Sequence, residues 1–105
     1  MSRHRVVLVT ASSEKEARKI GTALLKEKLA ACVSVVPKIS SSYWWKGKIE
    51  TTSESLLLIK TEAARVPKLI RKVKQVHSYA VPEVIALPIL EGNPEYLRWI
   101  GQSVK

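Results

Sequence analysis

The apolar positions of this chain follow two periods, one typical of strands and the other typical of helices. A short buried strand is predicted at residues 4–11, which contain the continuous apolar run Val6 to Val9. A helix is predicted next, because Ser13 and Glu16 have the spacing of a capping box. The apolar stripe of that helix consists of Ala17, Ile20, Leu24 and Leu29.

The middle of the chain predicts a long hairpin. Residues 31–45 are rich in β-branched and aromatic side chains, and residues 48–61 end in another apolar run. Lys46-Gly47 between them is a turn signal, because glycine supplies the positive φ that a tight reversal needs. Pro37 indicates a bend or an edge position, since it has no N–H to donate to a ladder.

The last third predicts a helix, a strand and a short terminal helix. The helix occupies residues 62–76, and the strand occupies residues 83–90. Pro88 again indicates an edge or a bend. Asn93 is suited to cap the terminal helix and Pro94 to occupy its first position.

This order of elements predicts the fold class. With right-handed crossovers it gives an α+β, ferredoxin-like split βαβ (βαββαβ) with a long central hairpin and a short C-terminal helix. The 105 residues are expected to form a single domain, 1–105. The middle strands are roughly twice as long as the outer ones, so the hairpin overhangs the sheet and leaves unpaired edges. We therefore expect a homo-oligomer whose hairpins pair between subunits, with an interface that contains Tyr43, Trp44 and Trp45.

The net charge of +9 raises the possibility of a nucleic-acid partner, and the distribution of the charge argues against it. The basic residues concentrate on one arc of helix 62–76, opposite an apolar arc, which is typical of a solvated helix face. RNA-recognition modules share this order of elements, but they carry stacking aromatic residues on their central strands. The strand "VVLVTA" has no aromatic residue and the chain has no Phe, so no nucleic-acid partner is expected.

The sequence predicts neither membrane insertion nor export. No apolar stretch approaches the roughly 20 residues that span a bilayer, and the first apolar run is too short for a signal peptide. A single Cys32 forms no internal disulfide, which fits a reducing compartment. A cytoplasmic location is therefore expected, unless an organellar or secretory segment was removed from a longer precursor.

The chain offers no motif of a nucleophilic or metal-dependent enzyme, so no catalytic activity is expected. Cys32 begins an apolar strand, where a buried inert thiol is the usual state. His4 and His77 are the only histidines, and together with one cysteine they supply no dedicated transition-metal cage from a single chain. A partial site completed by a second subunit is still compatible with the sequence.

The stretch "HSYAVPEVIALP", residues 77–88, has two interpretations. Pro82 disfavours the helical region at the residue before it, so the stretch is first of all a joint between a helix and a strand. The alternative is a weak, partly open cation site at a subunit interface, with His77, Tyr79 and Glu83 as nitrogen and oxygen donors. Such a site binds Cu²⁺ most tightly among divalent ions and loses affinity below about pH 6.5, as the imidazole protonates.

Two hairpin residues are expected beside that site. Lys60 and Trp45, together with Tyr79, are predicted to line the binding cleft. Lys60 and the positive net charge also favour a different ligand for the cleft, a small anionic metabolite.

Several strings resemble one known family, the CutA divalent-cation tolerance proteins. They are "LAACVSVVP", "YWWKGKIE", "LLLIKT", "VHSYAVPEVIALPI" and "GNPEYLRWI", and the resemblance extends over residues 5–103. The most specific pieces are W-K-G-K and H-x-Y-x-x-P-E, and "YWWKGKIE" and "VPEVIALP" are similar to the animal and plant members. The resemblance implies a ferredoxin-like fold, a homotrimer built by hairpin pairing, and an association with tolerance to copper and other divalent ions.

The same resemblance implies an alternative function. CutA trimers are similar to the PII signalling proteins, which bind small effectors in clefts between subunits. The chain also departs from the copper ligands proposed for some bacterial members: Thr10 stands in place of a cysteine, and Val76 in place of a second histidine. Only His77 of that set is present, so any copper site is expected to be weak and not required for folding.

Overall fold

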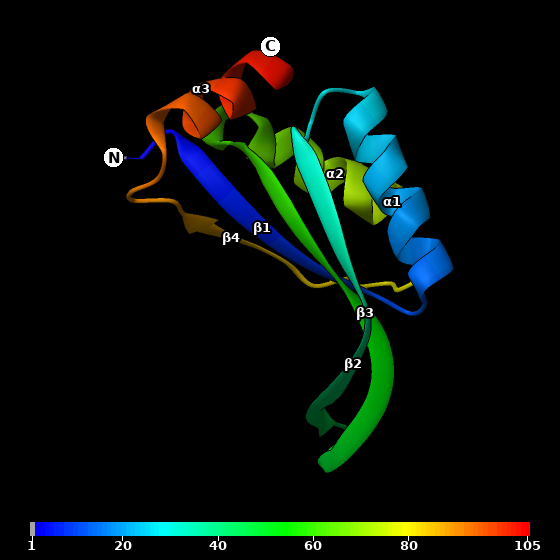
Figure 1. Ribbon diagram of the computed structural model, residues 1–105. Coiled ribbons are helices and arrows are strands. Elements are labelled where there is room, and N and C mark those ends of the chain that lie inside the picture. Colours follow the sequence, from blue (N-terminus) through cyan, green and yellow to red (C-terminus); the bar gives the residue numbers. More distant parts are fainter. Residues whose placement is uncertain (1) are drawn as a thin grey trace.

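The computed structural model describes residues 2–105 and shows a four-stranded antiparallel sheet with the strand order β2-β3-β1-β4. Helices α1 and α2 lie side by side on one face of this sheet, and α3 lies at the end near both termini (Figure 1). The predicted ferredoxin-like α+β fold is confirmed. The elements are β1 (His4–Ala11), α1 (Glu14–Lys26), β2 (Cys32–Trp45), β3 (Lys48–Glu62), a 3₁₀ turn η1 (Ala63–Arg65), α2 (Val66–Val76), β4 (Val84–Pro88) and α3 (Pro94–Ser103).

The predicted boundaries differ from the observed ones in three places. The first helix, whose apolar stripe was expected to reach Leu29, ends at Lys26. The helix expected at 62–76 begins with the separate 3₁₀ turn η1, and the α-helix proper starts at Val66. The strand expected at 83–90 is shorter and ends at Pro88, which pairs with Arg5 and has no N–H for a further ladder bond. The turn of the hairpin is as predicted, with positive φ at Lys46 (50°) and Gly47 (78°).

The core lies between the sheet and the two helices. Alternate residues of the central strands point toward α1 and α2 and are fully buried, because side chains in a strand alternate between faces. The buried side chains of this layer include Val7, Val9, Leu57 and Ile59 from the strands and Ile20, Leu24, Leu69 and Val73 from the helices. This layer covers the part of the sheet from which the long hairpin extends.

The hairpin extends beyond the rest of the sheet, as predicted. β1 pairs with β3 only from Ser55 to Glu62, so residues 48–54 of β3 are paired with β2 alone. In Figure 1 this two-stranded ribbon projects away from the helices. The side chains of Tyr43, Trp44 and Trp45 on the ribbon are all exposed, Trp44 by 73%.

The sheet face opposite α1 and α2 is apolar and largely open. Val6 and Leu8 of β1 point toward this face, and Ile85 and Leu87 of β4 lie opposite them in the pairing. Ile85 is 51% exposed and Leu87 is 45% exposed. The face therefore retains apolar surface that α3 covers only at its end.

Candidate functional site

A large cleft lies where the root of the hairpin meets the loop after α2. Its volume is about 970 Å³. The lining combines residues from β2 and β3 with the loop residues 79–83 and the end of β1. Its acidic members are Glu50, Glu54 and Glu83, and its aromatic members are Tyr43, Trp45 and Tyr79.

The charge of this cleft is opposite to that of the whole chain. The chain has a net charge of +9, yet the lining contains three glutamates and neither lysine nor arginine. A concave surface lined by one sign of charge attracts counter-ions of the other sign. The cleft therefore favours cations, although the protein as a whole favours anions.

Glu54 is the buried carboxylate of the cleft. The residue is only 8% exposed, and its Oε2 accepts a hydrogen bond of 2.8 Å from the hydroxyl of Tyr79. Burial, together with the hydrogen bond and the charge of Glu54, raises the pKa of Tyr79 to about 12, so the hydroxyl stays protonated and donates. No hydrogen bond within residues 2–105 reaches Oε1 of Glu54, and this oxygen is open to solvent, since no buried side-chain oxygen in that range lacks a partner.

His77 lies behind the cleft and holds the loop in place. Its side chain is fully buried, with Nε2 at 2.7 Å from the carbonyl oxygen of Thr10. The N–H of Tyr79 donates to Nδ1 at 3.0 Å. Since a carbonyl only accepts, Nε2 carries the proton, and the lone pair of Nδ1 is already used. The ring as it lies here does not fit a metal ligand, and the joint is the role that its contacts support.

Glu16 is a second anchor of this loop, which the sequence analysis missed as such. Its Oε2 accepts from the N–H of Ser78 at 2.8 Å, and its Oε1 accepts from the N–H of Ser12 at 2.9 Å. Ser13 caps α1 as predicted, by accepting from the N–H of Glu16 at 3.1 Å. The carboxylate thus ties the start of α1 to the segment that carries Tyr79.

The free energy of unfolding at acid pH should reveal the contact of Glu16 with Ser12 and Ser78. Burial alone would raise the pKa of Glu16, but hydrogen bonds from Ser12 and Ser78 outweigh it and lower the pKa from 4.5 to about 2. A depressed pKa stabilises the fold above the unfolded value, so this contribution is complete above pH 4.5 and is lost as pH falls toward 2. Glu16→Gln should therefore cost roughly 1–2 kcal/mol at neutral pH, allowing for solvent screening.

Urea unfolding at pH 7 and pH 3, at one protomer concentration, measures this effect. The difference in the free energy of unfolding between the parent and Glu16→Gln should be smaller at pH 3 than at pH 7. Glu14→Gln is the matched control, because Glu14 is exposed and pairs only with Arg18 on the same helix. A difference in the free energy of unfolding that is the same at both pH values would contradict this role of Glu16.

The structure brings some of the predicted site residues together and separates others. Tyr79, Glu83 and Trp45 line the same cleft. Lys60 does not line it, and its ammonium instead lies 3.3 Å from the Ser34 hydroxyl and 3.9 Å from the Cys32 sulfur. Glu54, which the sequence analysis did not single out, takes the central position.

The part of the chain that the structure describes bears on two kinds of feature: a cluster of metal ligands and a helix that could span a membrane. Within residues 2–105 there is no group of three or more His, Cys, Asp or Glu side chains that could hold a metal ion. None of the helices in that range is long and apolar enough to cross a membrane.

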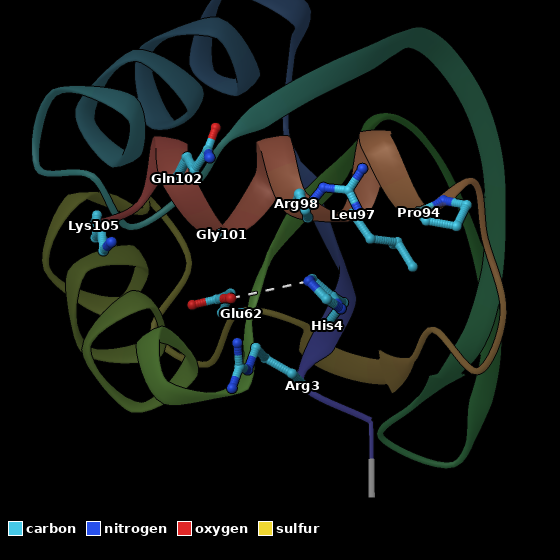
Figure 2. A pocket seen from close by; sticks show the side chains of 9 residues that line it. All are labelled: Arg3, His4, Glu62, Pro94, Leu97, Arg98, Gly101, Gln102 and Lys105. Carbon is cyan, nitrogen blue, oxygen red and sulfur yellow. Dashed lines mark ion pairs between the residues drawn. The ribbon is translucent and has the colours of Figure 1, made fainter.

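A second cavity of about 470 Å³ lies beneath α3 at the far end of the sheet (Figure 2). Figure 2 shows Glu62 facing His4 across it, with 3.9 Å between Oε2 and Nε2. A Cβ atom at Gly101 would lie 2.7 Å from the Glu62 carboxylate, so the Glu62 side chain would have to move to admit a larger residue there. Arg3, Arg98 and Lys105 surround that acid, and the mixed signs make this cavity a weaker candidate than the cleft.

The fold and the cleft define a ferredoxin-like α+β protein with an overhanging hairpin and an acidic, aromatic cleft at its root. The family model described as CutA1 divalent ion tolerance protein matches residues 5–103. This match spans nearly all of the sequence, and the chain belongs to the CutA1 divalent ion tolerance family.

Individual relatives agree with this assignment. The divalent-cation tolerance protein CutA of Thermus thermophilus is 51% identical over 98 residues, which are 93% of this chain and 95% of that protein. Protein CutA of Mus musculus is 52% identical over 90% of this chain and 53% of its own length. The chloroplastic protein CutA 1 of Oryza sativa is 47% identical over 95% of this chain and 56% of its own length. The chain thus spans little more than half of the mouse and rice relatives.

Solved structures of two of these proteins confirm the fold. The Thermus thermophilus divalent cation tolerance protein has a TM-score of 0.93 at 50% identity, over 95% of this chain and 97% of that chain. CutA1 of Oryza sativa has a TM-score of 0.95 at 45% identity, over 99% of this chain and 95% of that chain. Since the rice relative is named as chloroplastic, the cytoplasmic location expected from the sequence stays a prediction.

Proposed function

We propose that this protein is a non-enzymatic homotrimer that binds divalent cations, copper among them, weakly in its acidic clefts. The observation that carries the proposal is the lining of the cleft, which has three glutamates and no lysine or arginine. The printed names of the family and of the Thermus relative refer to divalent ion or cation tolerance, which supports a role with the same class of ions.

The carboxylates of the cleft are better ligands than the histidine behind it. Glu54 has a free oxygen, and Glu83 is an exposed carboxylate on the same cleft. His77 becomes a ligand only if its bond to the N–H of Tyr79 opens, which would leave a buried donor unpaired. An ion held by a few spaced oxygens keeps most of its water, and its affinity is correspondingly low. The hydrophobic core between the sheet and the helices forms without a bound ion.

The assembly follows from the surfaces that one chain leaves uncovered. The ribbon at residues 48–54 has an unpaired edge, and the sheet face with Ile85 and Leu87 is apolar and exposed. Three copies related by a rotation axis satisfy both, by pairing hairpins and covering the open faces. Tyr43, Trp44 and Trp45 then lie at the interface, where the neighbouring subunit narrows each cleft.

Calorimetric titration with Cu²⁺ and Mn²⁺ tests the ion site. Removing both charges with Glu54→Gln and Glu83→Gln should weaken binding by about tenfold or more, since the charge of the cleft attracts the hydrated ion and each carboxylate contributes to that charge. Glu91→Gln is the matched control, because Glu91 is exposed and lies outside the cleft lining. Unchanged affinity in the double variant would overturn the carboxylate site, and a loss confined to His77→Ala would move the site to the imidazole.

A second candidate function is that of a PII-like sensor for a small molecule in the same cleft. The observation in its favour is the volume of about 970 Å³, which is of the size that organic ligands occupy and far exceeds that of a single ion. The anionic ligand suggested by the net charge lacks support, because Lys60 lies outside the cleft. Thermal-shift screening with metals, nucleotides and carboxylates separates the two functions, because a ligand at 100 times its dissociation constant adds about 2.7 kcal/mol.

A further inference from the structure

We propose that the cleft takes a linear aliphatic polyamine, an organic cation whose ammonium groups are separated by methylene chains. This inference rests on the proposed binding of cations in the cleft and adds the chemical class of a ligand. Three features of the cleft carry it: the spacing of its acids, its exposed aromatic rings, and the free oxygen of its buried carboxylate.

The acids of the cleft come from separate places and do not converge on one point. Glu50 and Glu54 are four residues apart along β3, which corresponds to about 13 Å of strand. Glu83 lies on the loop before β4. Within residues 2–105 no three such side chains are grouped closely enough to hold a metal ion. Spaced carboxylates match a ligand whose positive charges are themselves spaced along a chain.

The aromatic rings supply the other half of the match. Tyr43 is 40% exposed and Trp45 is 57% exposed, and both line the cleft beside the acids. A hydrated metal ion gains nothing from apolar ring faces. Methylene groups pack on them, and an ammonium group over a ring is attracted by its electron-rich face. The cleft thus offers carboxylates to the ammonium groups of a polyamine and apolar ring faces to its methylene chains.

Glu54 supplies the cleft with a carboxylate that is held in a fixed position. It is more than nine-tenths buried, and the hydroxyl of Tyr79 fixes one of its oxygens at 2.8 Å. The other oxygen has no hydrogen-bond partner within residues 2–105. A primary ammonium group has three N–H donors and no acceptor, so it can pair with this oxygen and still reach other acceptors. A charge-assisted bond to this oxygen is stronger than a bond between neutral groups, and the oxygen is accessible because no buried side-chain oxygen of residues 2–105 lacks a partner.

Calorimetry on the full chain at low ionic strength tests the inference, with spermidine and 1,4-diaminobutane as probes. Spermidine should bind more tightly than the diamine, because it has one more charge. The matched controls are 1,4-butanediol, which has the same chain without charge, and butanedioate, which has the opposite charge. Neither should bind. Raising the salt should weaken spermidine binding, since the attraction is between charges at an open cleft.

Two pairs of variants locate the site. Glu83→Gln should weaken spermidine binding by about fivefold or more, and Glu54→Gln by about tenfold, whereas Glu91→Gln outside the cleft should change it less than twofold. Trp45→Ala should weaken it by about fivefold, whereas Trp99→Ala should not, because Trp99 is a half-exposed tryptophan on α3 and does not line the cleft. Glu83 and Trp45 are exposed, so their variants are expected to fold even if Glu54→Gln does not.

The outcomes separate this inference from the proposal on which it rests. Binding of Cu²⁺ or Mn²⁺ that is lost in the carboxylate variants, without any binding of spermidine, overturns the polyamine and leaves the ion site standing. If neither the divalent ions nor spermidine binds, the inference and the proposed function are overturned together. Equal binding of spermidine and butanediol, or equal losses of affinity in Trp99→Ala and Trp45→Ala, would show non-specific contact and also overturn the inference.

Discussion

Replacement of His77 by alanine is expected to lower the midpoint of thermal unfolding by about 10 °C or more. The substitution removes both bonds of the buried ring, to the Thr10 carbonyl and to the N–H of Tyr79, and leaves a cavity. Unpaired buried groups and a cavity together cost about 3 kcal/mol, and each kcal/mol shifts the midpoint of a domain of this size by roughly 4–8 °C. Calorimetric scans at one protomer concentration measure the change.

His77→Ala also distinguishes the two interpretations of residues 77–88, a joint between a helix and a strand or a cation site. If His77 is a joint, His77→Ala is less stable but still binds cations at temperatures well below its midpoint, through the carboxylates of the cleft. Gln75→Ala serves as the control, because Gln75 is an exposed residue of α2 two positions before His77. A fully stable His77→Ala protein that has lost copper binding would make the ring a ligand and contradict the joint.

Leu87→Asp is expected to convert the proposed trimer into monomers at micromolar concentration. The side chain is 45% exposed in the single chain, so aspartate there is hydrated and folding of the monomer is tolerated. In an assembly that covers this sheet face, the carboxylate would be buried without a partner, which costs several kcal/mol in each subunit. Sedimentation velocity should show the mass fall from three chains to one.

Leu25→Asp is the matched control for this prediction. Leu25 is 43% exposed, nearly the same as Leu87, and it lies on α1, on the helical side of the sheet. The same chemical change there should leave the mass unaltered. A parent protein that sediments as a monomer would contradict the trimer directly, and a trimer that survives Leu87→Asp would place the interface elsewhere.

The fold was predictable from the sequence because its signals are local. The Ser13 cap of α1, the turn at Lys46-Gly47 and the apolar runs of the strands all act over a few residues, and each formed as expected. The return bond of the capping box did not form, because Glu16 accepts from the N–H of Ser12 and not from that of Ser13. The boundaries of α2 and β4 were wrong by a few residues. Ladder pairing decides where β4 ends, and no local signal marks the 3₁₀ turn before α2.

The candidate site was only partly predictable, because its contacts join residues distant in sequence. The hydroxyl of Tyr79 meets Glu54, and Glu16 meets the N–H of Ser78, two contacts that depend on the packed fold. Lys60 was expected beside Trp45 because both belong to the hairpin. The ladder pairs Lys60 with Cys32 at the opposite end from the turn, about 20 Å of strand beyond Glu54.

The bulge at Pro37 has a consequence for the cleft. Ladder pairing moves from Val36 opposite Leu56 to Ile39 opposite Glu54, so β2 holds one residue more than β3 at this point, and the Ser55 hydroxyl donates to the Pro37 carbonyl at 2.6 Å. Every side chain of β2 beyond the bulge therefore points to the face opposite the one it would take in an unbroken ladder. Because of that single inserted residue, Trp45 pairs with Lys48 on the face of the ribbon that carries Glu50 and Glu54, and Trp44 pairs with Ile49 on the other face.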